Sequence, residues 1–217
     1  MDNQINWKNH YNIVHKKSKQ IGGWILSSFF SRDKQVMLVL FTTLVRPIVE
    51  YGCVVTCPHL KKDIVLLEQV QRSFTAKIDG FRNLNYWERI TKLGISSLQR
   101  RREILMILHI WKIKNGVYPN SISLQFKLHA RSNALKAVLQ PLPRVKGSLL
   151  RKYEESFIIR ACKLWNILPP GLTHVVIFRS FKTQIQNFCK GIRDEPPLPG
   201  YPVKNNNSLL EQCLKLR

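Results

Sequence analysis

Negative charge is scarce in this sequence. It has 13 Asp and Glu residues against 35 Lys and Arg residues, which gives a formal net charge of +22. Between Glu103 and Glu154 there is no acidic residue at all. A chain this basic usually meets a polyanion, most often nucleic acid, and each phosphate contact would release counterions and make binding salt-dependent. The alternative is a basic surface that is only solvated.

The usual arrangements of catalytic residues are also missing. No pair of carboxylates is set for two-metal phosphoryl transfer, and the sequence has no Asp-Asp dipeptide. It also contains no phosphate-binding Gly-rich loop, no nucleophile elbow and no HExxH motif. We therefore expect that the chain is not an enzyme and that it needs no cofactor.

Cysteine is sparse and forms no regular framework. The five cysteines include no CxxC pair, and the first residues lack the apolar segment of a signal peptide. We therefore expect an intracellular protein, nuclear or cytoplasmic and not secreted. Cys53, Cys57 and His59 could be metal ligands, but their spacing is not that of a zinc finger and no fourth ligand is evident, so structural cysteines are favoured. No apolar run is long enough to cross a bilayer, so no membrane partner is expected.

Helical periodicity is the clearest structural signal. Residues 31–52 are apolar almost all round after Ser31 and Asp33, which predicts a central helix without a solvent face that Pro47 kinks or ends. Amphipathic patterns predict further helices over 4–20 (ended or bent by Gly22 and Gly23), 60–78, 85–94, 98–115, 157–168 and 178–188. The expected fold class is mainly α, an irregular helical bundle followed by a mixed, mostly helical extension.

The composition changes after residue 117, where prolines interrupt the helical pattern. We expect three regions. A helical bundle covers 1–120, and a basic extension with a short strand at 135–139 and a final helical pair covers 121–193. A Pro/Asn-rich tail at 194–217 is expected to be extended or disordered.

Cations that lie off the predicted apolar stripes are the candidate nucleic-acid contacts. They would bind phosphates without reading base sequence. Charge and position alone select Lys61, Lys62, Arg72, Arg100, Arg101, Arg102, Lys112 and Lys114. Five aromatic residues could stack on bases: Trp7, Trp24, Trp87, Trp111 and Tyr118. Trp111 lies on an apolar stripe and is better explained as a core residue.

An ordered series of short motifs runs from about Trp7 to near the C-terminus. The series includes Gly23–Leu26 (GWIL), Leu44–Pro47 (LVRP), Glu50–Gly52 (EYG), His59–Ile64 (HLKKDI), Val70–Thr75 (VQRSFT), Tyr86–Arg89 (YWER), Ser97–Arg102 (SLQRRR), Trp111–Ile113 (WKI) and Lys163–Asn166 (KLWN). In this order the motifs resemble the C-terminal part of the reverse transcriptases of non-LTR (LINE-type) retrotransposons, in the jockey and CR1-like group.

The resemblance implies a helical thumb, which in such RNA-directed DNA polymerases grips the template–primer backbone, followed by a basic extension. It also implies a missing palm domain as a possible partner, because the fingers, the palm with its paired aspartates and the endonuclease have no counterpart in this sequence. The leading hypothesis is a non-catalytic nucleic-acid-binding fragment of such a polymerase. The alternative is a translated relic without a selected function, or an accessory protein that binds other proteins.

Overall fold

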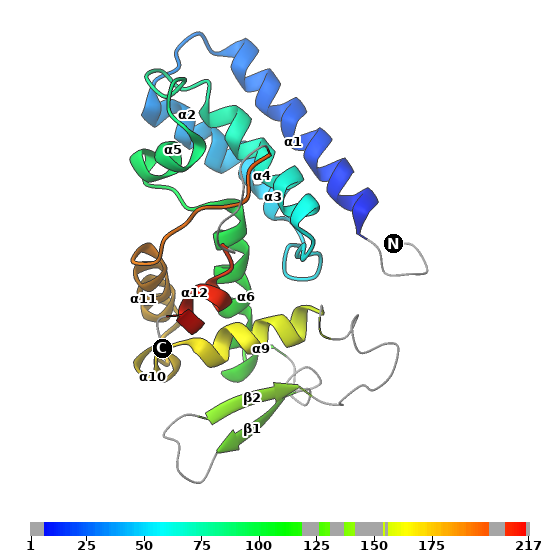
Figure 1. Cartoon of the computed structure of the whole chain (residues 1–217), viewed down its shortest axis with the longest axis vertical. Coiled ribbons are helices and arrows are strands. Elements are labelled where there is room, and N and C mark those ends of the chain that lie inside the picture. Colours follow the sequence, from blue (N-terminus) through cyan, green and yellow to red (C-terminus); the bar gives the residue numbers. More distant parts are fainter. Residues whose placement is uncertain are drawn as a thin grey trace. The chain divides into compact units, whose positions relative to one another are not determined.

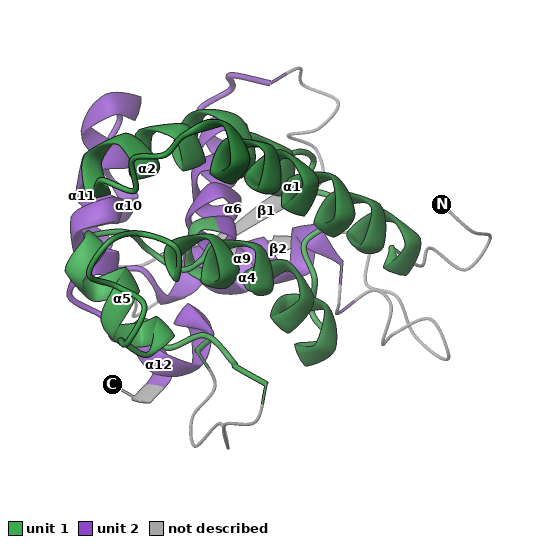
Figure 2. Ribbon diagram, turned by 90° about the horizontal axis from the view of Figure 1, so that it is seen from above, with its two compact units in different colours: residues 1–101, 194–207 green, residues 102–193, 208–217 purple. Residues whose placement is uncertain are grey.

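The computed structural model describes residues 7–118, 126–130, 137–141, 154, 156–199 and 207–215. As predicted, these residues are mainly helical (Figure 1). Their contacts divide the chain into two compact units: unit 1 has residues 1–101 and 194–207, and unit 2 has residues 102–193 and 208–217 (Figure 2). The division therefore falls after Arg101 and not near residue 120, and part of the predicted tail belongs with the N-terminal unit.

The first helix of unit 1, α1 (Lys8–Ser28), is longer than predicted. It continues through Gly22 and Gly23, which were expected to end or bend it. Gly22 is buried, and a Cβ atom built at this position would lie 3.5 Å from the ring of Phe74. At this distance a Cβ atom would make an ordinary van der Waals contact, so Gly22 lies on the packed side of α1 and the helix continues through it.

The stretch predicted as one central helix is three helical segments: α2 (Lys34–Leu40), the π-helical η1 (Phe41–Val45) and α3 (Arg46–Glu50). The carboxylate of Asp33 caps α2 by accepting from the N–H groups of Gln35 and Val36, at 2.8 and 3.1 Å. The prediction that this stretch has no solvent face is wrong. Its core side is narrow, and several apolar residues point outward: Val36, Val39 and Leu44.

The π-helical segment explains how the buried side chains of α2, η1 and α3 stay on one side of the helix. Met37, Phe41, Val45 and Val49 are buried at steps of four residues. In a regular α-helix four residues exceed one turn of 3.6, so such a series would drift by about 40° at each step. The wider turn of η1 corrects this drift. It also places Pro47 at the start of α3, where its missing N–H costs no helical hydrogen bond.

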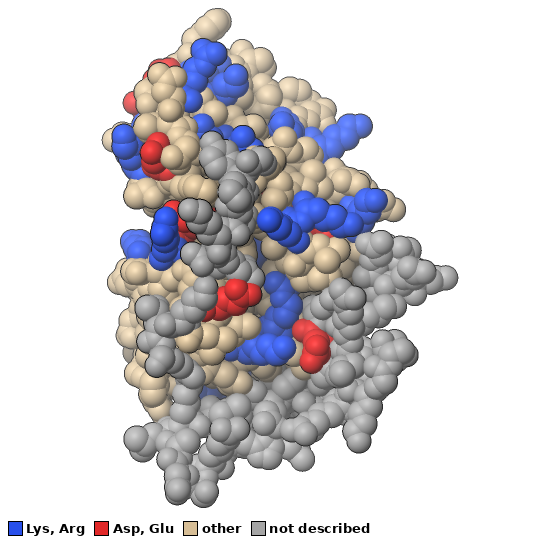
Figure 3. All heavy atoms as spheres, in the orientation of Figure 1, with Lys and Arg blue, Asp and Glu red and all other residues tan. Residues whose placement is uncertain are grey.

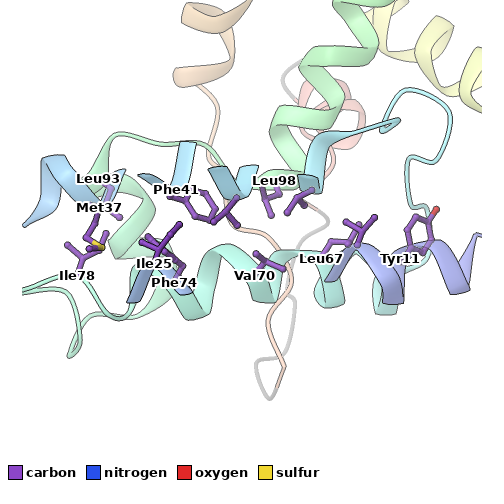
Figure 4. Packing of buried hydrophobic residues seen from close by; sticks show 13 residues of the cluster. Tyr11, Ile25, Met37, Phe41, Leu67, Val70, Phe74, Ile78, Leu93 and Leu98 are labelled. Carbon is purple, nitrogen blue, oxygen red and sulfur yellow. The ribbon is translucent and has the colours of Figure 1, made fainter. Parts of the chain in front are cut away.

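The described part of unit 1 has three further helical elements: α4 (Lys61–Thr75), α5 (Tyr86–Leu93) and the first turn of α6 (Leu98–Lys114). The predicted cap of α5 is confirmed, because Asn85 and Glu88 form a capping box and Gly94 ends the helix at φ 67°. Figure 4 shows side chains of α1, α2, η1 and α4–α6 meeting in one core, in which the Phe41 and Phe74 rings lie 5.0 Å apart.

A buried polar network fixes the start of α6. The carboxylate of Glu68 accepts from the Tyr86 hydroxyl at 2.5 Å and from the backbone N–H groups of Leu98 and Gln99 at 3.0 and 3.2 Å. These N–H groups have no partner within their own helix, and the helix dipole favours negative charge there. Burial and the adjacent carboxylate raise the pKa of Tyr86 well above its ordinary value.

The first residues of the predicted tail take part in the same network. The Asp194 carboxylate accepts from the Ser97 N–H and hydroxyl, each at 2.7 Å, while the Ser97 oxygen accepts from the Arg100 N–H at 3.0 Å. Leu198 packs with Tyr86 in a second small core. Residues 97 positions apart in the sequence thus hold each other, a contact that local patterns could not indicate.

Among its described residues, unit 2 contains the remainder of α6, a β-hairpin and four helices: α9 (Phe157–Ile167), α10 (Pro170–Thr173), α11 (Phe178–Lys190) and α12 (Leu209–Lys215). Strands β1 (Phe126–Ala130) and β2 (Ala137–Pro141) pair antiparallel with Phe126 opposite Pro141. The predicted strand at 135–139 falls partly on β2, and residues 135 and 136 lie outside the described residues. The predicted helical pair is confirmed as α9 and α11, whereas α10 and α12 were not predicted.

Aromatic side chains form the centre of unit 2. The Trp165 and Phe181 rings lie 5.7 Å apart, and the Trp111 and Phe181 rings 5.9 Å apart. The Trp111 Nε1–H donates to the Val175 carbonyl at 2.8 Å, so the polar edge of this buried ring is satisfied. The interpretation of Trp111 as a core residue is confirmed.

Candidate nucleic-acid interface

The exposed side of α1 is the strongest cationic surface that the structure describes in unit 1. The helix contains no Asp or Glu. Its buried side faces the core and α4, and it leaves four lysines on the solvent side: Lys8, Lys16, Lys17 and Lys19. Figure 3 shows Lys and Arg side chains over α1 with few acidic side chains between them. None of these lysines was among the predicted contacts.

The start of α4 supplies two predicted cations at the same end of unit 1 as the start of α1. Lys61 and Lys62 are both exposed, as expected for contacts with a large ligand. α4 runs in the same direction as α1, since Tyr11 lies beside Leu67 and Gly22 beside Phe74, so both helices begin at the same end of the unit (Figures 1 and 4). Cations in a first helical turn oppose the helix dipole. Lys61 and Lys62 therefore do not stabilise α4, and a bound anion would offset this cost.

Two of the three predicted arginine contacts on α6 are buried, and the third, Arg101, is half-buried. The side chains of Arg100 and Arg102 are each 1 % exposed. One Arg100 guanidinium nitrogen donates to the Asn207 carbonyl at 3.2 Å, and Arg101 pairs with both carboxylate oxygens of Glu50, Nη2 to Oε2 at 3.0 Å. The expectation that all three reach solvent or a ligand was wrong. Successive residues of an α-helix point about 100° apart, so three in a row cannot share one exposed side.

Of the remaining predicted cations, Arg72 is half-buried, and the ammonium groups of Lys112 and Lys114 contact groups within unit 2. Arg72 is half-buried next to Arg89, whose guanidinium donates to the Arg72 carbonyl at 3.2 Å. In unit 2 the Lys112 ammonium lies 5.1 Å from the Phe178 ring centre. The Lys114 ammonium lies 5.3 Å from the Trp165 ring centre and donates to the Thr173 carbonyl at 3.0 Å. Partial burial lowers the pKa of Lys114.

The scarce carboxylates serve mainly to hold the fold. Asp33 caps α2, Glu88 caps α5, Glu68 and Asp194 cap α6, and Glu50 pairs with Arg101. In unit 2 the Glu103 carboxylate accepts from the Leu209 N–H at 3.1 and 3.2 Å, at the start of α12. These negative charges are committed to internal donors, so they compete little with an external polyanion for the lysines.

The candidate stacking residues divide clearly by exposure. Trp111 is buried, Trp7 and Tyr118 are half-buried, and the Trp87 Nε1–H donates to the Pro196 carbonyl at 3.0 Å. Trp24 alone among these five is strongly exposed, at 58 %. It lies on the same helix as the α1 lysines.

No group of three or more His, Cys, Asp or Glu side chains suited to a metal ion occurs among the described residues. Cys53 is buried and Cys57 is half-buried, and neither forms a disulfide. None of the helices in the described part of the chain is long and apolar enough to cross a membrane. Most of the cations between Glu103 and Glu154 belong to residues whose side chains lie outside the described ones.

Comparisons with known proteins add no assignment. No protein-family model, no curated protein and no solved structure matches this chain.

Proposed function

We propose that this chain is a non-catalytic nucleic-acid-binding protein derived from the thumb and post-thumb region of a non-LTR retrotransposon reverse transcriptase. It binds the phosphate backbone of RNA, DNA or an RNA–DNA hybrid, inside the cell, in the nucleus or the cytoplasm. The observation that carries the proposal is the acid-free, exposed side of α1, with Lys8, Lys16, Lys17 and Lys19 and the nearby Lys61 and Lys62.

The chemistry of these side chains fits backbone binding. A lysine ammonium is a compact charge on a flexible stem, which contacts phosphates without fixing a base geometry. Several such contacts on one polymer release several counterions, so affinity should fall steeply with salt. The order of the retrotransposon-like motifs along the chain supports the same proposal.

The experiment compares two triple variants that remove the same charge. Lys16, Lys17 and Lys19 on α1 are replaced by Gln in one, and Arg179, Lys182 and Lys190 on α11 in the other, which are equally exposed and also lie on an acid-free helix. Affinity for an RNA–DNA hybrid, duplex DNA and heparin is measured across a salt series. The α1 variant should lose affinity and about 0.9 of the salt slope for each phosphate contact removed. Equal losses in both variants would contradict a specific α1 interface.

A second candidate function rests on the outward apolar residues of α2 and η1. Val36, Val39 and Leu44 share one side of these segments, and Val39 is 59 % exposed. Exposed apolar surface of this kind is typical of a protein-binding face, which suits an accessory protein or one that lacks its palm domain. A reading frame for a palm next to the gene would favour this candidate. Equal binding to hybrid, duplex and heparin that salt abolishes would favour a relic.

A further inference from the structure

Two aromatic rings are exposed at the C-terminal end of the α1 lysine surface. Trp24 is 58 % exposed in the last two turns of α1, and Phe30, just beyond the helix, is 99 % exposed. Both rings leave apolar area in water, which folding alone disfavours. The adjacent surface is cationic, whereas an apolar protein partner is normally met by a surface depleted of lysine.

The helix aligns Trp24 with one of the cations, Lys17. Ile13, Lys17, Gln20 and Trp24 follow one another at steps of four, three and four residues, the spacing of one helical stripe, and all four are exposed. Seven residues separate Lys17 from Trp24, which corresponds to about 10 Å along the helix axis. A base stacked on Trp24 therefore has its neighbouring phosphates within reach of a lysine side chain.

The segment after α1 is held in place, so Phe30 has a defined position. The Arg32 guanidinium donates to the carbonyls of Leu26 and Phe29, which ties the end of α1 to the following turn. The Arg32 carbonyl in turn accepts from the Asp79 N–H at 3.1 Å. These contacts anchor the backbone on both sides of Phe30 and leave its ring outside.

We propose that this end of α1 binds single-stranded nucleic acid, with unpaired bases stacked on Trp24 and Phe30 and phosphates on Lys16, Lys17 and Lys19. The inference rests on the proposed function and refines it by naming the strand state of the ligand. In a duplex each base is covered by its neighbours and offers only its edges, whereas an unpaired base offers its whole face to a ring. The lysines can bind either form, but the rings can engage only an unpaired base.

The test uses the full chain with Trp24→Leu, Trp24→Phe and Phe30→Leu, and with Ile13→Ala as the matched control. Ile13 is 65 % exposed on the same stripe but has no ring. Binding is measured by fluorescence anisotropy with a single-stranded oligouridylate and with a blunt duplex of the same length, at one salt concentration. Circular dichroism checks that each variant folds, and since the replaced side chains are exposed, folding should be intact.

We expect Trp24→Leu to weaken single-strand binding about tenfold and Phe30→Leu to weaken it less. Trp24→Phe should restore most of the affinity, and duplex binding and Ile13→Ala should stay within about twofold of the wild type. Equal loss for single strand and duplex, or no loss for either, would overturn the stacking proposal while leaving backbone binding intact. Absence of wild-type binding to both ligands would instead overturn the proposed function.

Discussion

The arginines that open α6 and the lysines of α1 carry the same charge but occupy opposite environments. Arg100 is 1 % exposed and donates to a carbonyl of the segment that returns after residue 194, and Arg101 pairs with Glu50. The α1 lysines face solvent from a helix without a carboxylate. A guanidinium has a planar set of donors that satisfies fixed acceptors, and its stem packs against apolar groups.

The comparison shows that a cluster of cations in a sequence does not define a binding surface. Three consecutive arginines spread around a helix, and the carboxylates and carbonyls near that helix decide which of them stay inside. Lys16, Lys17 and Lys19 lie outside the buried side of α1, on a helix that carries no carboxylate. Helical phase and the position of the few acidic residues are therefore better guides than local charge.

The largest expected loss of stability is at Glu68, whose carboxylate holds the start of α6, the helix that carries the arginines. Glu68→Ala leaves the Leu98 and Gln99 N–H groups and the Tyr86 hydroxyl without their acceptor inside the protein. We expect the free energy of unfolding to fall by about 3 kcal/mol. Urea denaturation followed by circular dichroism measures this loss.

Two variants control the Glu68 experiment. Glu68→Gln keeps one acceptor oxygen in the same place and should lose only part of the stability. Lys62→Ala, on the exposed side of the same helix, should change the stability by less than about 0.5 kcal/mol. A Glu68→Ala protein as stable as the wild type would show that the network does not hold the start of α6.

Arg100→Ala should give the next largest effect, and on stability only. It removes the donor to the Asn207 carbonyl and the buried stem, so we expect a loss of about 2 kcal/mol. Nucleic-acid affinity, measured at a temperature where the variant is folded, should match that of the wild type. Normal stability with reduced affinity would instead show that Arg100 belongs to the binding surface, as the α1 lysines are proposed to do.

Local signals in the sequence predicted most of the helices, because helix caps and apolar stripes act within a few residues. The helix α5 begins and ends where it was expected to, with Asn85 and Glu88 at its start and Gly94 at its end. The start of α6 at Leu98 is also as predicted. Its cap is Ser97, whose hydroxyl oxygen accepts from the Arg100 N–H and which is held by Asp194 far away in the sequence. Residues 194–207 also supply the partner of Arg100, so no local pattern could indicate that this arginine is buried.

The candidate site was predictable only in part for the same reason. Lys61 and Lys62 are exposed as expected, because the apolar stripe of α4 shows directly which side of the helix faces solvent. The α1 lysines could have been found from the lack of acidic residues in 8–28, which is visible in the sequence. The π-helical turn of η1 rotates the buried side of the helix by a fraction of a turn. A sequence pattern that assumes 3.6 residues per turn cannot represent this rotation.

A histidine on the inner side of α1, His15, should affect the stability through its titration, in contrast with the lysines on the exposed side. Burial lowers the pKa of His15 from 6.5, the nearby Lys19 lowers it further, and a hydrogen bond with Gln69 opposes both effects. The unfolded chain then binds the proton more readily than the folded one, so the stability falls as the pH drops through 6.5 and below. Denaturation midpoints at pH 7.5 and 5.5 measure this dependence.

Replacing His15 separates its contribution from that of other groups. His15→Gln should make the stability less dependent on pH over this interval. Some dependence should remain, because burial and Lys112 also lower the pKa of His109 in unit 2. Lys19→Gln removes the like charge and should bring the pKa of His15 closer to its usual value. An unchanged pH profile in His15→Gln would show that His15 titrates alike in both states.

The smallest expected effect is on the stability of the variant that lacks Lys16, Lys17 and Lys19. Lys16 and Lys19 are three residues apart on the same helix, where like charges repel by a few tenths of a kcal/mol. The whole chain carries a net charge of +22, which also opposes compaction. Replacement by Gln should therefore leave the free energy of unfolding within about 0.5 kcal/mol of the wild type, with any change toward greater stability. A clear loss of stability would mean that these lysines hold the fold as the α6 arginines do. If the stability is unchanged or higher while the affinity is lost, these charges do not stabilise the fold. That result is expected for side chains whose role is to bind an external polyanion.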